Sequence, residues 1–249
     1  MILAMPLAQA GTLLVAAASD LVYCIDELAL AFRKQEPGAE VKVSTGASGN
    51  FFAQIKRGAP FDVFMSADMD YPRQLAEEGA ADPASLTPYA IGRLAVWTLD
   101  ARFDPSQGMR LFADARLTRV AIANPDVAPY GRAARAALVH HGVWQQVQGK
   151  LAMGDNVAQA AQFVQTGNAQ VGIVSLATVL APRMKGVGRY AVVAQGGLAP
   201  LEQGVVVTRQ GQANPLAARF VQFLQTAAAR DILQRSGFGL PRAGAGGGQ

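Results

Sequence analysis

Residues 13–20 read Leu-Leu-Val-Ala-Ala-Ala-Ser-Asp, a short apolar run that ends in two polar residues. A run of this length and composition is typical of a buried parallel strand. From Val22 to Gln35 apolar residues recur at helical spacing, and Ser19 and Asp20 are residue types that cap helix starts. The stretch therefore predicts a strand, a polar turn and a helix in succession.

The same unit recurs along the rest of the chain. After a turn at Pro37-Gly38, a strand-like segment precedes Ser48 and a second helical stretch. This alternation predicts α/β architecture with mainly parallel sheets flanked by helices. Strands are expected at Val41–Ser44, Asp62–Met65, Leu94–Leu99, Val120–Ala123, Val171–Val174 and Gly204–Thr208, and helices at Phe51–Arg57, Tyr71–Glu78, Gly131–His141, Val157–Thr166 and Pro215–Gln234.

The length of the chain, 249 residues, is enough for two lobes that each bury a core. Two crossings between lobes are expected near Arg93–Trp97 and Gly204–Thr208. We expect residues 11–90 and 201–242 to form lobe 1 and residues 91–200 to form lobe 2, hinged by the two crossing strands.

Both ends of the sequence differ in composition from the rest. Residues 1–10 are apolar and end in Ala-Gln-Ala, which is typical of the end of a secretory signal peptide. Residues 243–249 are rich in glycine and predict a disordered tail. No later stretch reaches the ~18 apolar residues that span a bilayer. The sequence thus predicts a secreted, soluble protein, and a periplasmic location.

The composition argues against several functional classes. Half of the residues are apolar (51%), only 16% are charged, and the formal net charge is +4. Lysine and arginine are scattered singly, which is unlike a nucleic-acid groove. Cys24 is the single cysteine, so the sequence excludes an intrachain disulfide, a cysteine-rich zinc site and an iron-sulfur cluster.

Four segments share one design, in which an apolar strand or loop leads through a small or polar residue into a helix. Each helix start directs free backbone N–H groups outward and carries about half a positive elementary charge. Four converging starts would offer about two positive charges to a dianion without any lysine or arginine. The segments are Ala18-Ser19-Asp20, Ala47-Ser48-Gly49-Asn50, Ala128-Pro129-Tyr130-Gly131 and Gly154-Asp155-Asn156-Val157.

Hydroxyl groups in these segments would add directional donors for the oxygens of a small oxyanion. Ser19, Ser48 and Tyr130 are the candidates. The two serines could equally serve as helix caps, which is the commoner role of such residues. Gly49 and Gly131 would let a ligand approach the backbone closely, or could simply serve turns.

Five longer segments resemble the periplasmic molybdate-binding proteins of ABC importers, in the same order and spacing from about Gly11 to Pro241. This resemblance implies two α/β lobes hinged around a cleft, which close on the anion and present it to a membrane permease. The segments are Ala16–Asp20, Ser44–Ile55, Gly58–Asp68, Asn124–Arg132 and Gly237–Pro241.

The resemblance also implies roles for individual residues. Ser19 and Ser48 match the hydroxyl and amide donors of the first lobe, and Ala128 or Tyr130, together with Val157, match the contacts of the second lobe. Some members carry a tyrosine where this chain has Ser175, so Tyr130 becomes the expected phenol. The full candidate set for ligand binding is Ser19, Asp20, Ser48, Gly49, Ala128, Tyr130, Asn156 and Val157.

Asp20 is a second departure from the family pattern, because a carboxylate beside an anion pocket is repulsive unless it turns away or accepts a proton. Phosphate carries a proton near neutral pH that a buried carboxylate could accept, whereas molybdate, tungstate and sulfate do not. We expect Asp20 to cap a helix and the ligand to be molybdate or tungstate. Phosphate and sulfate remain the alternatives.

Two other functional classes are less consistent with the sequence. For an enzyme, Gly46-Ala-Ser48-Gly49 has its second glycine one place early for a nucleophile turn, and adjacent His140 and His141 point in different directions on a helix. For a metal site, Asp62, Asp68 and Asp70 are more economically assigned to interlobe hydrogen bonds. For a sensory domain of a transcriptional regulator, the chain has no room for DNA-binding helices. We therefore expect a monomeric binding protein without catalytic activity, cofactor, resident metal or nucleic-acid partner.

Overall fold

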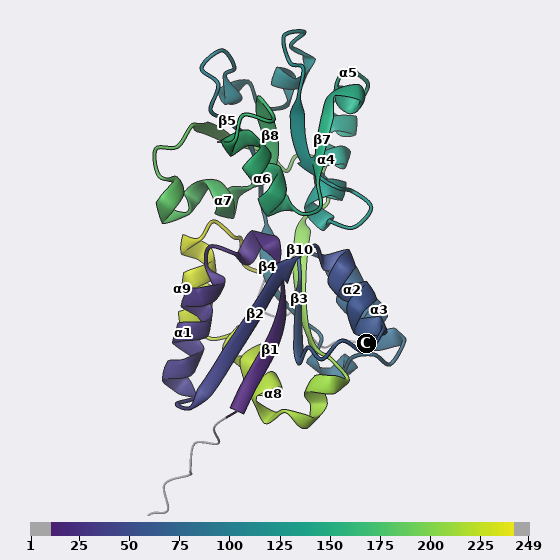
Figure 1. The fold of residues 1–249 in the computed structure, drawn as a ribbon, viewed down its shortest axis with the longest axis vertical. Coiled ribbons are helices and arrows are strands. Elements are labelled where there is room, and N and C mark those ends of the chain that lie inside the picture. Colours follow the sequence, from purple (N-terminus) through teal and green to yellow (C-terminus); the bar gives the residue numbers. More distant parts are fainter. Residues whose placement is uncertain (1–10, 242–249) are drawn as a thin grey trace, which may run out of the picture.

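The computed structural model describes residues 11–241 as two α/β lobes stacked end to end (Figure 1). Each lobe is built on one five-stranded sheet with helices on its faces. This confirms the predicted fold class. The expected signal-peptide remnant, residues 1–10, and the expected tail, residues 243–249, lie outside the described residues.

The first sheet has the strand order β2-β1-β3-β10-β4. β1 runs parallel to β2 along its whole length, from Gly11 opposite Ala39 to Ala18 opposite Gly46, and it also runs parallel to β3. β10 is antiparallel to both of its neighbours. The strands are β1 Gly11–Ala18, β2 Ala39–Gly46, β3 Val63–Ser66, β4 Thr87–Gly92 and β10 Leu201–Val207.

The second sheet has the order β7-β6-β8-β5-β9 and repeats the pattern of the first. β6 is parallel to β7 and β8, and β5 is antiparallel to β8 and β9. The strands are β5 Leu94–Thr98, β6 Val120–Ala123, β7 Leu151–Gly154, β8 Val171–Ser175 and β9 Arg189–Val192.

The reversed strand in each sheet is the first one after the chain crosses from the other lobe. Only Arg93 separates β4 from β5, and residues 193–200 separate β9 from β10. β4 and β9 run toward the junction between the lobes. The strands that follow them, β5 and β10, therefore run away from the junction, into the other lobe. The other strands of both sheets therefore have their carboxyl ends at the junction between the lobes, where the following turns meet.

Helices cover both faces of the first sheet. α1, α8 and α9 pack on one face through Phe32, Phe220 and Leu233, and α2 and α3 pack on the other through Ile55 and Leu75. The helices of the first lobe are α1 Ile25–Gln35, α2 Ser48–Lys56, α3 Asp70–Glu77, α8 Pro215–Phe223 and α9 Ala227–Arg235. Those of the second lobe are α4 Pro129–His140, α5 Trp144–Val147, α6 Val157–Gln165 and α7 Leu176–Leu180.

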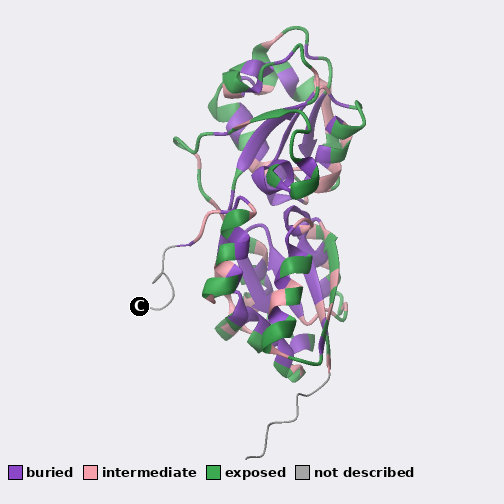
Figure 2. Ribbon diagram, turned by 90° about the vertical axis from the view of Figure 1, so that its left-hand side faces the viewer, coloured by how far each residue is buried: buried purple, intermediate pink, exposed green. Residues whose placement is uncertain are grey.

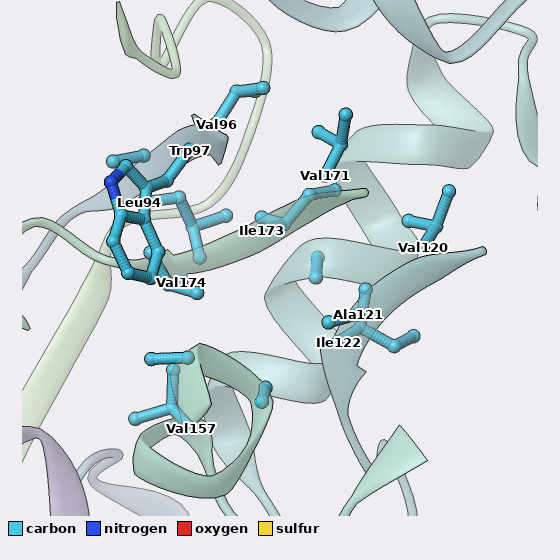
Figure 3. Close-up of a cluster of buried hydrophobic side chains, with 14 of the residues drawn as sticks. Leu94, Val96, Trp97, Val120, Ala121, Ile122, Val157, Val171, Ile173 and Val174 are labelled. Carbon is cyan, nitrogen blue, oxygen red and sulfur yellow. The ribbon is translucent and has the colours of Figure 1, made fainter. Parts of the chain in front are cut away.

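The core of the second lobe surrounds Trp97, which is fully buried and packs near Val96 and Ile173 (Figure 3). Its indole N–H donates to the Val187 carbonyl at 3.0 Å, so the polar group of this side chain keeps a hydrogen-bond partner although the ring is buried. In both lobes the buried residues concentrate on the sheets and the inner faces of the helices (Figure 2). Each lobe thus has a core of its own, which gives the junction between the lobes rigid walls.

Short 3₁₀ helices connect several of these elements: η1 Ser19–Leu21, η2 Pro83–Ser85, η3 Pro105–Ala113, η4 Gln148–Lys150, η5 Pro182–Met184 and η6 Gln210–Ala213. Within residues 11–241, no helix combines the length and the apolarity needed to cross a bilayer.

Two local predictions were wrong. Ser19 and Asp20 do not cap α1, because they form η1 and the helix begins only at Ile25, after Cys24. The final helix is not continuous from Pro215 to Gln234. Thr226 interrupts it, since its hydroxyl accepts from the Ala229 N–H at 3.4 Å and starts a new helix.

Candidate functional site

A small cavity lies between the lobes, at the carboxyl ends of the parallel strands. Its volume of about 10 Å³ is close to the space of one water molecule. Seven of the eight predicted residues border it, and Gly49 does not. The lining residues are Ala18, Ser19, Asp20, Gly46, Ala47, Ser48, Ala67, Ala128, Pro129, Tyr130, Asn156 and Val157.

The first lobe contributes two buried serines to the cavity. Ser19 follows β1 and Ser48 follows β2 as the first residue of α2, so adjacent parallel strands bring the two hydroxyls to one edge of the sheet. The Ser48 hydroxyl accepts a hydrogen bond from the Ala67 N–H at 3.0 Å, which fixes its position. Ala67 was not predicted, although its place directly after the buried strand β3 could have indicated it.

The second lobe contributes the starts of α4 and α6. Tyr130 lies in the first turn of α4 and is 3% exposed. Val157 is the first residue of α6 and borders the cavity, and its side chain belongs to the hydrophobic core (Figure 3). The first N–H groups of each helix have no partner within that helix. Both starts therefore offer backbone donors to a ligand.

Two of the predicted residues already use their polar groups in hydrogen bonds within their own turns. The Ala128 N–H donates to the Asn124 carbonyl at 2.9 Å. The Asn156 side chain accepts from the Gln159 N–H at 3.1 Å and caps α6. Both residues border the cavity, but their contribution is to shape the helix starts that point into it.

Gly49 and Gly131 serve close packing. The Gly49 N–H donates across the lobes to the Val127 carbonyl at 2.9 Å, and a Cβ atom there would lie 2.8 Å from that oxygen. A Cβ atom on Gly131 would lie 2.3 Å from the Ala123 carbonyl oxygen. The absence of a side chain therefore lets two backbone segments approach each other closely, between the lobes at Gly49 and within the second lobe at Gly131.

Asp20 is fully buried in the wall of the cavity. Its Oδ2 accepts from the Gln203 side-chain amide at 2.5 Å, and its Oδ1 has no hydrogen-bond partner within residues 11–241. Burial raises the pKa of this carboxyl to about 6, and the Gln203 amide and the Tyr130 hydroxyl offset part of the rise. The expected capping role is therefore wrong, because the side chain lies in the cavity wall and caps no helix.

Gln203 connects Asp20 to a chain of buried hydrogen bonds. The Tyr89 hydroxyl donates to Gln203 Oε1 at 2.7 Å, which turns Nε2 toward Asp20 and, at 3.5 Å, toward the Tyr130 hydroxyl. Burial raises the pKa of Tyr130 well above its usual value, so its phenol stays neutral and can donate. Sequence reasoning missed Gln203, which follows Glu202 at the start of β10, before the apolar run that ends the strand.

Charged and aromatic side chains also join the lobes around the cavity. Arg132 in α4 pairs with Asp68 after β3, and its guanidinium donates to the Tyr71 hydroxyl at 3.2 Å. Burial raises the pKa of Asp68, and the positive charge of Arg132 opposes that rise. Asp68 thus bonds across the lobes as expected.

The other two predicted interlobe carboxylates bond within the first lobe. Asp62 accepts from the Leu14 N–H at 2.7 Å, and Asp70 pairs with Arg73 of the same helix. Ser175 does not border the cavity, because its hydroxyl bonds to that of Thr178 at 2.7 Å and caps α7.

A second, larger hollow of about 960 Å³ lies next to the hinge segments, bordered by Arg93, Arg132 and Glu202. It is far larger than a small anion, and charges of both signs line it. The small cavity presents only neutral donors and one carboxyl group, and residues of both lobes border it. It is therefore the better candidate for recognition of a small anion.

Residues 11–241 contain no group of three or more histidine, cysteine, aspartate or glutamate side chains placed to hold a metal ion. His140 and His141 are exposed at the end of α4, with ring centroids 5.1 Å apart, and neither borders the cavity. Ser48 therefore has no histidine beside it to act as a base.

Comparisons with known proteins agree with this geometry. Residues 13–239 match the family described as bacterial extracellular solute-binding protein. The molybdate-binding protein ModA of Rhodobacter capsulatus is 37% identical, with 95% of this chain and 91% of the relative covered. The corresponding protein of Azotobacter vinelandii is 36% identical, with 94% and 92% covered. The solved structure of the Azotobacter vinelandii periplasmic molybdate-binding protein covers 92% of this chain and 100% of its own, with a TM-score of 0.86 and 32% identity.

Proposed function

The chain belongs to the family of bacterial extracellular solute-binding proteins, and from this premise we propose that it captures molybdate or tungstate between its lobes and delivers the ion to an ABC importer. The proposed partners are the oxyanion and the membrane permease, and the proposed location is the periplasm. We propose that the protein works as a monomer, without catalytic activity or cofactor. Relatives that are named molybdate-binding proteins support the choice of ion.

One observation carries the proposal: neutral donors from both lobes converge on a single small cavity. Ser19 and Ser48 approach from the first lobe, and the helix starts at Tyr130 and Val157 approach from the second. No lysine or arginine borders the cavity in the described part of the chain. The partial positive charges of helix starts and the dipoles of hydroxyl groups can replace the hydration shell of a dianion.

Capture requires the lobes to separate. We propose that residues 11–92 with 201–241 move as one lobe, that residues 94–192 move as the other, and that Arg93 and residues 193–200 form the hinge. A cavity of about 10 Å³ admits no ion while the lobes are closed. Opening therefore admits the ion, and closure exchanges its water for protein donors.

The alternative is another tetrahedral oxyanion, sulfate or phosphate. A hydrogen phosphate ion would donate a hydrogen bond from its P–OH group to the carboxylate of Asp20, which is the specific feature that favours it. We prefer molybdate and tungstate because this chain matches relatives that are named molybdate-binding proteins over nearly its whole length. Sulfate is distinguished from them only by size, so a direct comparison is needed.

Calorimetric titration of the purified protein with molybdate, tungstate, sulfate and phosphate tests the proposal. We expect molybdate and tungstate to bind far more tightly than the other two. Ser48→Ala should weaken molybdate binding at least about tenfold, because it removes one buried donor. Ser44→Ala, on the exposed side of β2, is the matched control and should bind as the wild type does. Tight binding of phosphate alone would exclude the proposed ligand.

A further inference from the structure

The Asp20 carboxyl is a group in the cavity wall that the proposed function does not explain. It is fully buried, and its Oδ1 has no hydrogen-bond partner within residues 11–241. Its Oδ2 is already engaged by the Gln203 amide at 2.5 Å. One carboxyl oxygen is therefore available to whatever occupies the cavity.

A charged carboxylate at this position would repel a dianion. No lysine or arginine borders the cavity within the described residues, so no cation offsets the repulsion. A neutral carboxylic acid, in contrast, carries an O–H group and can donate a hydrogen bond to an oxyanion oxygen. The protonation state of Asp20 thus decides whether it opposes or supports the bound ion.

We propose that Asp20 is a specificity-determining residue that binds the oxyanion as a neutral acid, with a proton on Oδ1 donated to the ion, so that capture takes up one proton from solvent. This inference rests on the proposed function, because it concerns the same cavity and the same class of ligand. It makes the affinity for a dianion depend on pH, and it discriminates against ions that carry their own proton.

The environment of Asp20 agrees with this assignment. Burial already raises its pKa to about 6, and a dianion in the cavity would raise the pKa further. Above about pH 6 the free protein therefore loses the proton from Asp20 and must regain it when the ion binds. Below that pH the carboxyl is protonated in advance, and the affinity for a dianion no longer depends on pH.

The titratable groups that face Asp20 stay neutral through this range. Burial raises the pKa of Cys24 to about 12, and it raises the pKa values of Tyr89 and Tyr130 well above 10. Helices α6 and α7, which pack against the same turn, contain no titratable side chain. The charged residues of β2, Glu40 and Lys42, pair with each other opposite the start of β1, far along the strand from Ala18. Asp20 is thus the group whose titration the ion should sense.

Calorimetry of the wild-type protein with molybdate, in buffers of different ionisation enthalpy, counts the protons taken up. We expect close to one proton per molybdate at about pH 8 and close to none at about pH 5, with affinity falling up to about tenfold per pH unit above pH 6. Molybdate is a dianion throughout this range, so the protein is the source of any linkage.

Asp20→Asn provides the second measurement. The side-chain amide of this variant could accept from Gln203 through its oxygen and donate to the ion through its nitrogen, which reproduces the neutral acid without a titration. We expect the variant to take up no proton, and at about pH 8 to bind molybdate up to about 100-fold more tightly than the wild type. Asp126→Asn, at an exposed carboxylate in the loop before α4, should behave as the wild type does.

The outcomes separate this inference from the proposed function. Molybdate binding by the wild type with no proton uptake at pH 8 would overturn the inference and leave the proposed function standing. Weaker binding by Asp20→Asn at both pH values, with phosphate as the preferred ion, would show that Asp20 accepts a proton instead. Failure to bind molybdate or tungstate at any pH would remove the proposed function, and the inference with it.

Discussion

The carboxylate of Asp68, which follows β3, forms an ion pair with the guanidinium of Arg132 in α4, and this pair joins the two lobes beside the cavity. The guanidinium also lies over the Tyr71 ring, 5.1 Å from its centroid, and donates to its hydroxyl. On the other side of Asp68, the Ser66 hydroxyl and the Tyr71 N–H hold the carboxylate in place. Because the pair spans the lobes, it stabilises the closed arrangement specifically.

Arg132→Gln should therefore weaken molybdate binding without touching the ion. We expect a loss of about fivefold, mainly as faster dissociation, because a partly exposed pair of this kind contributes on the order of 1 kcal/mol to closure. Stopped-flow release of molybdate, together with small-angle scattering of the free protein, would measure both effects. Arg73→Gln is the matched control, since Arg73 pairs with Asp70 of the same helix and not across the lobes. Equal dissociation rates for the two variants would contradict the prediction.

Gly92→Ala should displace the Tyr130 hydroxyl, because the added methyl group would occupy its place. A Cβ atom on Gly92 would lie 2.6 Å from that oxygen and 2.9 Å from Gln203 Nε2, so the phenol must move. We expect at least about tenfold weaker molybdate binding, comparable with the effect of Tyr130→Phe, in calorimetric titrations. Gly149→Ala adds a Cβ atom that meets nothing within 4 Å and should bind normally. Unchanged affinity in Gly92→Ala would remove Tyr130 from the site.

The turns around the cavity were predictable because a few consecutive residues determine each of them. An apolar run before Ser19, and a small residue before Ser48, both indicate that a strand ends and a helix start follows. Parallel pairing of β1 and β2 then brings the two serines to the same edge. Local sequence and one topological rule were sufficient for this half of the site.

Contacts between distant residues were not predictable in the same way. Gln203 meets Asp20 across 183 positions of sequence, and no local pattern indicates that bond. The same holds for the turn that buries Asp20, where capping was the commoner role of the residue type. Pairing partners in the fold decided these side chains, and they lie outside any local window.

Edge strands were missed for a related reason. β9 is largely exposed and reads Arg-Tyr-Ala-Val, and β7 is a short edge strand with an exposed Met153. Neither has the buried apolar run that identifies β6 or β8. An edge strand is held mainly by backbone bonds to its neighbour, which leave little trace in composition.

Thr226→Ala should destabilise the first lobe by a modest and measurable amount. The side chain accepts from the Ala229 N–H and donates to the Phe223 carbonyl at 2.7 Å, so it begins α9 and ends α8. Loss of such a cap costs about 1 kcal/mol of the free energy of unfolding. Urea unfolding would measure the change. Thr166→Ala, at an exposed hydroxyl beyond the end of α6, should cost less. An equal loss in both variants would contradict the capping role.

Asp20→Asn should change how the stability of the free protein depends on pH. Burial raises the folded-state pKa of Asp20 from 3.8 to about 6, so the folded protein holds this proton more tightly than the unfolded chain does. The free energy of unfolding of the wild type should then fall as the pH rises from about 4 to about 6, and the loss should be complete above that range. The full loss is on the order of 3 kcal/mol, taken from the size of the shift.

The carboxyls of Asp100 and Asp114, whose pKa values lie at about 2 beside Arg102 and Arg116, titrate below this window. The pKa of Asp68 is also raised by burial, so a smaller slope of the same sign remains in every variant. Urea unfolding without oxyanion, at a series of pH values, should therefore show a steeper slope for the wild type and for Asp126→Asn than for Asp20→Asn. Identical slopes in all three proteins would mean that Asp20 is not held near neutral pH in its protonated form.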